Sequence, residues 1–213
     1  MTTQDPRPRP PRKLASGRLE AFSDGVFAIA ITLLVLELAV PAGAEDDLLD
    51  AFLDQWPSYL AYVVSFSTIG AIWLAHNGIT DYLERADSGF IRLNLLLLMV
   101  VSFLPFPTRL LGEHIGEDDP ERVAVTIYGL TLLAASALVS VLWRYAVHEK
   151  LVSPDAEDED VQLLTKRLTP GLAAYAVIII LGLFFPLVAV VAYLAVAVFF
   201  IVPFKQIRQH LFG

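Results

Sequence analysis

Long apolar runs separated by short polar segments are the main pattern of this chain. A helix that crosses a bilayer needs about 20 mainly apolar residues, because each residue adds about 1.5 Å and the hydrocarbon core is about 30 Å thick. The pattern predicts six such helices, at approximately 18–40, 56–78, 90–112, 121–147, 163–184 and 187–204. We therefore expect an all-α integral membrane protein with six transmembrane helices per subunit.

The last two predicted spans share one apolar stretch, Leu172–Val202. This stretch is too long for a single span, and Gly182 and Pro186 near its middle disfavour a continuous helix. We therefore expect a tight hairpin of two short helices in this part of the chain.

The composition agrees with a membrane location. Hydrophobic residues make up 56% of the 213 residues, and the mean hydropathy is +0.61, well above the values of soluble domains. The chain has no cysteine. Disulfides, thiolate metal sites and cysteine nucleophiles are therefore excluded.

The positions of the basic residues predict the topology. With the N-terminus in the cytoplasm, thirteen of the 15 Lys and Arg residues fall in inside segments, and only Arg109 and Arg122 fall outside. Because basic residues accumulate on the cytoplasmic side, this bias predicts an even number of spans with both termini cytoplasmic. The chain then divides into a disordered, basic, proline-rich cytoplasmic tail at 1–17, a six-span domain at 18–205 and a short cytoplasmic tail at 206–213.

Acidic residues gather in the two longer predicted outer loops, at 45–54 and 113–121. They either concentrate cations at an external mouth through their field, or they are solvated connectors. Glu37 is expected near the same interface, because it lies thirteen residues, or about 20 Å of helix, beyond Asp24. It either attracts cations there or extends its carboxylate toward the headgroups.

Polar residues at the start of span one form the densest cluster at a membrane boundary, where an unpaired charge is costly. We expect Asp24 to accept hydrogen bonds from polar side chains of span two, which recur at i, i+3 and i+4 near the same end. This network either only locks the two spans together or gives His76 a role in gating or pH response. Its members are Arg18, Phe22, Ser23 and Asp24 on span one, and Trp73, His76 and Asn77 on span two.

Beyond this cluster, Ile29, Leu33 and Leu36 recur along one face of span one, with Thr32 on almost the same face. A bulky stripe of this kind is typical of helix packing and, less often, of a pore lining. The residues alone leave both interpretations open.

The ionisable residues and the sequence motifs bear on three classes of membrane protein. A proton-coupled secondary transporter remains an alternative because His76, Asp24 and Glu37 are ionisable, although no paired interrupted helices or inverted repeat are visible. An enzyme is not expected, because the four histidines fall on different segments and no hydrolase, metalloprotease or phosphate-loop motif is present. No catalytic residue, cofactor or bound metal is expected. A purely structural membrane protein is the third class.

The segment from Arg18 to Asp24 reads Arg-x-x-x-Phe-Ser-Asp and continues as Gly-Val-Phe-Ala-Ile-Ala-Ile-Thr-Leu-Leu-Val. It resembles span one of the single-repeat prokaryotic members of the transmembrane protein 175 potassium channel family. The resemblance covers the chain from about Arg18 to Lys205 and leaves out the proline-rich tail. As in that family, no glycine-rich selectivity filter of the usual potassium-channel kind is present.

The resemblance implies a potassium-preferring cation channel in a bacterial plasma membrane. It implies a homotetramer in which span one of each subunit lines a central pore, with potassium as the permeant ion. By position, Ile29 matches the hydrophobic constriction of the family, Leu33 and Leu36 match further bulky layers, and Thr32 matches a hydroxyl layer associated with potassium preference. The expected partners are further copies of the chain, potassium ions and the lipid bilayer, with no nucleic acid.

Overall fold

The computed structural model describes residues 16–38, 48–156, 158–168 and 170–202. The predicted tails lie outside these residues, apart from Ser16 and Gly17, which already belong to the first helix. The acidic segment at 45–47 also lies outside them.

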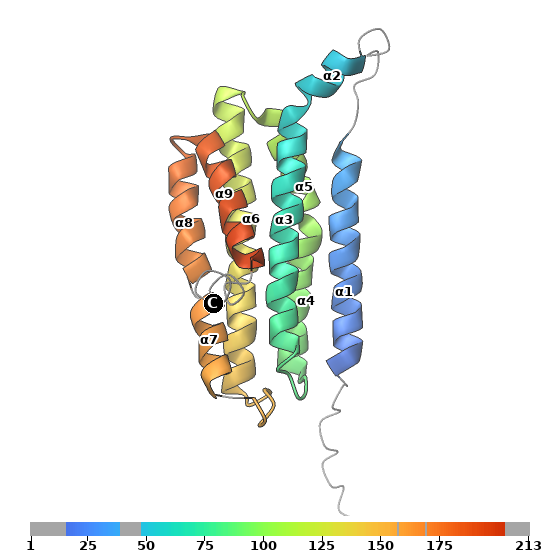
Figure 1. Ribbon diagram of the computed structural model, residues 1–213, viewed down its shortest axis with the longest axis vertical. Helices are drawn as coiled ribbons and strands as arrows, with labels where there is room; N and C mark the ends of the chain where they lie inside the picture. The colour runs from blue at the N-terminus through green and yellow to red at the C-terminus, as the bar shows by residue number, and fades with distance from the viewer. Residues whose placement is uncertain (1–15, 39–47, 157, 169, 203–213) are drawn as a thin grey trace, which may run out of the picture.

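Helices make up nearly all of the described chain and run side by side in one bundle (Figure 1). The first helix continues into a short 3₁₀ turn, η1, and Leu83 pairs with Val152 in an isolated antiparallel β-bridge. The elements are α1 (Ser16–Leu33), η1 (Leu34–Glu37), α2 (Leu48–Asp54), α3 (Trp56–Thr80), α4 (Ser88–Phe103), α5 (Pro105–His114), α6 (Asp118–His148), α7 (Asp158–Leu168), α8 (Pro170–Gly182) and α9 (Pro186–Ile201).

Five helical segments in the described residues are long and apolar enough to cross a membrane. They are Gly17–Glu37, Trp56–Thr80, Ser88–His114, Asp118–His148 and Val161–Gly182. The sixth predicted span corresponds to α9, which is apolar but has only 16 residues. At about 1.5 Å per residue it is shorter than a usual span. The fold is therefore that of an all-helical, multi-pass membrane protein.

Proline and glycine mark the breaks between neighbouring helices. The predicted hairpin is present: α8 ends at Gly182 and α9 begins at Pro186. The predicted third span is not one continuous helix, because α4 ends at Phe103 and α5 begins at Pro105. Proline suits the first position of a helix, since its missing N–H has no partner there in any case. The predicted fifth span is likewise divided, into α7 and α8.

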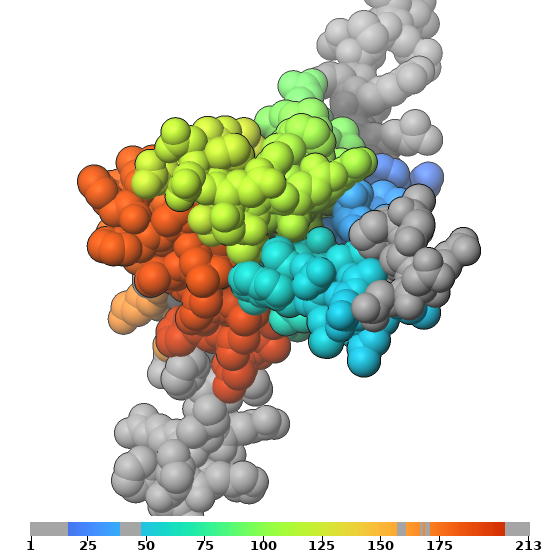
Figure 2. All heavy atoms as spheres, turned by 90° about the horizontal axis from the view of Figure 1, so that it is seen from above, coloured from blue at the N-terminus to red at the C-terminus, as the bar shows by residue number. Residues whose placement is uncertain are grey.

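The two ends of the bundle are built differently. One end, which Figure 2 shows end-on, consists of the start of α6, the α8–α9 turn, and α2 together with the start of α3. At the other end, the α3–α4 connector lies against the α6–α7 connector through backbone hydrogen bonds between Glu84 and Leu151 and between Ser153 and Tyr82. Asp87 of the α3–α4 connector caps α4 by accepting from the Phe90 amide, and it ties the connector to α6 by accepting from the Tyr145 hydroxyl.

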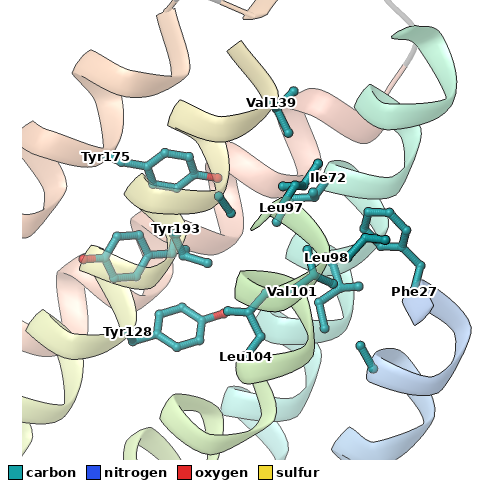
Figure 3. Close-up of a cluster of buried hydrophobic side chains, with 14 of the residues drawn as sticks. Phe27, Ile72, Leu97, Leu98, Val101, Leu104, Tyr128, Val139, Tyr175 and Tyr193 are labelled. Carbon is teal, nitrogen blue, oxygen red and sulfur yellow. The ribbon is translucent and has the colours of Figure 1, made fainter. Parts of the chain in front are cut away.

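Three tyrosines form the centre of the core between α6, α8 and α9 (Figure 3). The ring of Tyr193 lies 5.6 Å from that of Tyr128 and 6.3 Å from that of Tyr175. Gly129 makes this packing possible, because a Cβ atom there would overlap the Tyr193 hydroxyl. In lipid, close packing and interhelical hydrogen bonds hold helices together, since the surrounding acyl chains are as apolar as the core.

Candidate pore-lining helix and its polar anchors

Helix α1 lies at one edge of the bundle and contacts α3 and α4 with a single face (Figure 1). Ser23, Phe27, Ala30 and Leu34 recur at helical spacing and are all buried. A spacing of three and four residues puts side chains on one stripe of a helix. This stripe fixes the rotation of α1 about its own axis.

The opposite face of α1 is uncovered and mainly apolar. Ile29 is 60% exposed and Leu36 is 70% exposed, and Phe22, Thr32 and Leu33 are exposed beside them. An apolar face of this length on a helix at the edge of one subunit must meet lipid or another protein surface. The face therefore contains the whole stripe that the sequence singles out.

Thr32 is the hydroxyl residue of this stripe. Its Oγ1 donates a hydrogen bond to the backbone carbonyl of Ile29 over 2.9 Å. The proton is therefore used within the helix, and the lone pairs of the oxygen remain available to accept or to coordinate.

The predicted contact between Asp24 and span two is present. The Trp73 indole Nε1 donates to Asp24 Oδ1 over 2.9 Å. Hydrogen bonds between helices help to hold a membrane bundle together, and this one joins α1 directly to α3.

A second, fully buried connection joins α1, α3 and α4. Asn94 Nδ2 donates to Ser23 Oγ over 2.9 Å, and Asn94 Oδ1 lies 2.8 Å from His76 Nε2. Since the Asn94 carbonyl oxygen can only accept, His76 must carry its proton on Nε2 in this arrangement. Its Nδ1 is buried without a hydrogen-bond partner among the described residues.

The sequence prediction differs from the structure in two members of this network. Asn77, predicted as a possible donor to Asp24, is half-buried, and its side chain makes no hydrogen bond with any described residue. Asn94 of α4, which was not predicted, joins Ser23 to His76. His76 contacts Asn94 and the ring of Phe27, and it does not donate the predicted hydrogen bond to Asp24. Asn94 was missed, although a lone amide in the apolar run 93–101 is itself a signal of an interhelical hydrogen bond.

Arg18 and Phe22 do not join the network. Both are exposed on α1, and Arg18 forms no ion pair with any residue that the structure describes. The family-type signature is thus divided: Ser23 and Asp24 face the bundle, whereas Arg18 and Phe22 remain uncovered in the single subunit.

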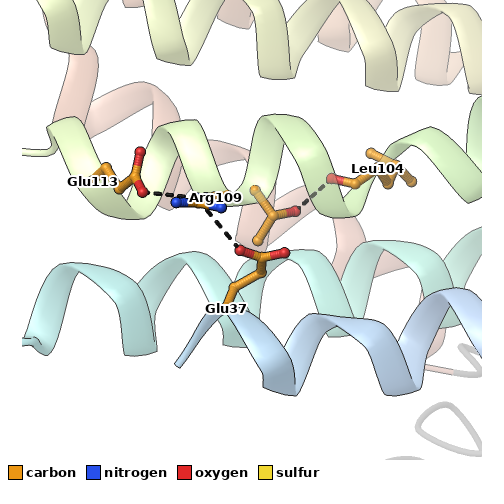
Figure 4. A network of polar contacts seen from close by, with 5 residues as sticks. Glu37, Leu104, Arg109 and Glu113 are labelled. Atoms are coloured by element: carbon orange, nitrogen blue, oxygen red, sulfur yellow. Dashed lines mark hydrogen bonds and ion pairs between the residues drawn. The ribbon is translucent and has the colours of Figure 1, made fainter. Parts of the chain in front are cut away.

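The far end of α1 has an ionic contact that the sequence reasoning did not identify. Glu37 Oε2 lies 3.8 Å from Arg109 Nε of α5, and the same nitrogen donates to Glu113 over 2.8 Å (Figure 4). Glu37 is thus paired with a cation of its own subunit. Within the described residues, no group of three or more His, Asp and Glu side chains is placed to hold a metal ion.

Comparisons with known proteins find potassium channels among the relatives of this chain. A family model described as endosomal/lysosomal potassium channel TMEM175 matches residues 18–105. A potassium channel of Streptomyces collinus is 50% identical over 129 residues, which cover 60% of this chain and 63% of that protein. A potassium channel of Chamaesiphon minutus is 43% identical over 168 residues, covering 76% of this chain and 82% of that protein.

A solved structure extends the likeness to the fold. The crystal structure of a lysosomal potassium-selective channel TMEM175 homolog from Chamaesiphon minutus has a TM-score of 0.79 and 39% sequence identity, and the match covers 87% of this chain and 95% of that chain. The chain therefore belongs to the TMEM175 potassium channel family.

Proposed function

We propose that this chain forms a homotetrameric, potassium-preferring cation channel, with α1 of each subunit lining a central pore. The exposed apolar face of α1 carries the proposal, because a buried stripe and two polar anchors hold the other face against the bundle. Four such faces around one axis would cover each other and enclose a narrow path. The description of the matching family model and the names of the two bacterial relatives all specify a potassium channel, which supports potassium as the permeant ion.

In this proposal Ile29 forms the constriction, and Leu33 and Leu36 form further bulky layers. A ring of isoleucine side chains has no atom that replaces the water around a cation, so it restricts passage by narrowing and dewetting the path. Conduction is then passive and requires only that the ring opens enough to admit water.

Thr32 supplies the selectivity in this scheme. Four hydroxyl oxygens with their protons donated to backbone carbonyls present lone pairs to a partly dehydrated cation. They replace fewer water molecules than a cage of backbone carbonyls does, so the preference for potassium over sodium is expected to be modest.

The polar network acts as a structural anchor in the same proposal. Ser23, Asp24, Trp73, His76 and Asn94 hold the first turns of α1 against α3 and α4, which keeps Ile29 directed away from the subunit. Arg18 and Phe22, which are uncovered in one subunit, would meet neighbouring subunits.

The test is a recording of purified protein in a planar bilayer with potassium on one side and sodium on the other. We expect a current without a proton gradient and a reversal potential that shows a preference for potassium. Thr32→Ala is expected to move the reversal potential toward zero without a loss of current. A flux that saturates and requires a proton gradient would instead identify a secondary transporter, and no current from an intact oligomer would contradict the proposal.

A further inference from the structure

Arg109 connects the end of the pore-lining helix to the body of the subunit. It projects from α5 between Glu37 at the last position of η1 and Glu113 one turn further along α5 (Figure 4). Its distance to Glu113 is 2.8 Å, so this carboxylate holds the guanidinium in place, while the longer 3.8 Å contact reaches Glu37.

The 3₁₀ form of η1 decides which side chains point inward. A 3₁₀ helix has three residues per turn, so residues i and i+3 lie directly above each other. Leu34, which is fully buried, therefore shares its direction with Glu37, which is paired with Arg109. Val35 and Leu36 point in the other two directions of the turn and are both exposed.

In a regular α-helix, Glu37 would be turned by about 60° from Leu34, because three residues span about 300°. The ion pair with Arg109 thus favours the tighter winding that aligns Glu37 with Leu34. The same winding sets the direction of Leu36, the outermost bulky residue of the stripe.

We propose that Arg109 is a positioning residue of the channel, which holds η1 in its tight form through Glu37 and so fixes Leu36 in the outer pore layer. This inference rests on the proposed function of α1. Arg109 does not contact the ion path itself and acts only through Glu37. Its side chain is 62% exposed, so solvent weakens the contact and the effect of losing it is expected to be graded.

The experiment uses the absence of cysteine in the chain, which allows one spin label per subunit to be attached at Leu36→Cys. Distances between labels are measured across the oligomer in liposomes by pulsed electron spin resonance, and potassium flux is measured on unlabelled protein. The label at Leu36→Cys, in a chain with no other substitution (the parental label), should give a narrow distance distribution. Arg109→Gln should broaden it and raise potassium leak about two- to fivefold, the size expected for a partly exposed ion pair.

Four companion variants separate a positioning role of Arg109 from a general loss of stability. Arg122→Gln removes a similar exposed ion pair, with Asp119, from the start of α6 and should change neither the distances nor the leak. The exchange E37R/R109E should restore the narrow distribution, and Arg109→Lys should keep it. If Arg109→Gln reduces assembly, Glu37→Gln, which leaves the Arg109–Glu113 pair in place, provides the comparison.

The outcomes distinguish this inference from the proposed pore. An intact oligomer in which the parental Leu36→Cys labels show no short distances would contradict the pore itself. A narrow parental distribution that Arg109→Gln and Glu37→Gln leave unchanged would overturn only the positioning role. Failure of the charge exchange to restore the distribution, with both single variants broadened, would also overturn it.

Discussion

Ile29→Asn is expected to increase potassium leak about tenfold, which corresponds to a decrease of about 1.4 kcal/mol in the free-energy barrier to ion passage. Ile29 is 60% exposed on the free face of α1, so the substitution leaves the packing within the subunit intact. An asparagine amide stabilises water where an isoleucine side chain excludes it, so the constriction stays hydrated for longer. Ions then cross with more of their hydration shell, and the preference for potassium over sodium should fall.

Flux from liposomes loaded with potassium or sodium measures both quantities. Ile29→Val, which keeps the site apolar and removes one methylene group, is the matched control and should change leak much less. Ile29→Ala should lie between the two variants. If Ile29→Asn and Ile29→Ala both leave flux and ion preference unchanged in an intact oligomer, Ile29 does not form the constriction.

Asn94→Leu is expected to lower the midpoint of thermal unfolding by about 4–8 °C, which corresponds to about 2 kcal/mol for a chain of this size. The side chains of Ser23, His76 and Asn94 are fully buried, and the amide of Asn94 contacts the other two. Leucine has a similar volume but leaves the His76 Nε2 proton and the Ser23 hydroxyl without this partner. Interhelical hydrogen bonds in membrane proteins contribute about 0.6–1.7 kcal/mol each, in line with this estimate.

Asn77→Leu is the matched control, because Asn77 makes no side-chain hydrogen bond with any described residue. Size-exclusion profiles in detergent and thermal unfolding of purified protein provide the measurements. Equal losses of stability for Asn94→Leu and Asn77→Leu would show that the buried connection between α1, α3 and α4 contributes nothing specific.

The sequence predicts those parts of the fold that depend on local chemistry. Apolar length identified the helices, and Gly182 with Pro186 identified the α8–α9 turn, because these residues act on the backbone in their immediate neighbourhood. The contact of Trp73 with Asp24 was also predictable, since a carboxylate at a membrane boundary requires a donor.

Contacts that depend on the rotation of one helix against another were less predictable. Identifying Asn94 as the residue that joins His76 to Ser23 requires knowing which face of α4 meets α1 and α3, and apolar length does not contain that information. The pairing of Glu37 with Arg109 depends in addition on the change from α to 3₁₀ winding at Leu34. The pore role proposed for Ile29 and Thr32 came only from the family resemblance, because the same stripe also suits packing against another helix.

The most direct test of a pore lined by α1 is block of potassium flux by Cd²⁺ in the variant Ile29→Cys. Thiolates bind soft metal ions, and the parental chain contributes no cysteine of its own. If four α1 helices surround the path, Cd²⁺ should stop the flux through Ile29→Cys and a chelator should restore it. Met99→Cys, at a position that is 61% exposed on α4, should conduct unchanged. Undiminished flux through Ile29→Cys at saturating Cd²⁺ would contradict the assignment of α1 as the pore lining.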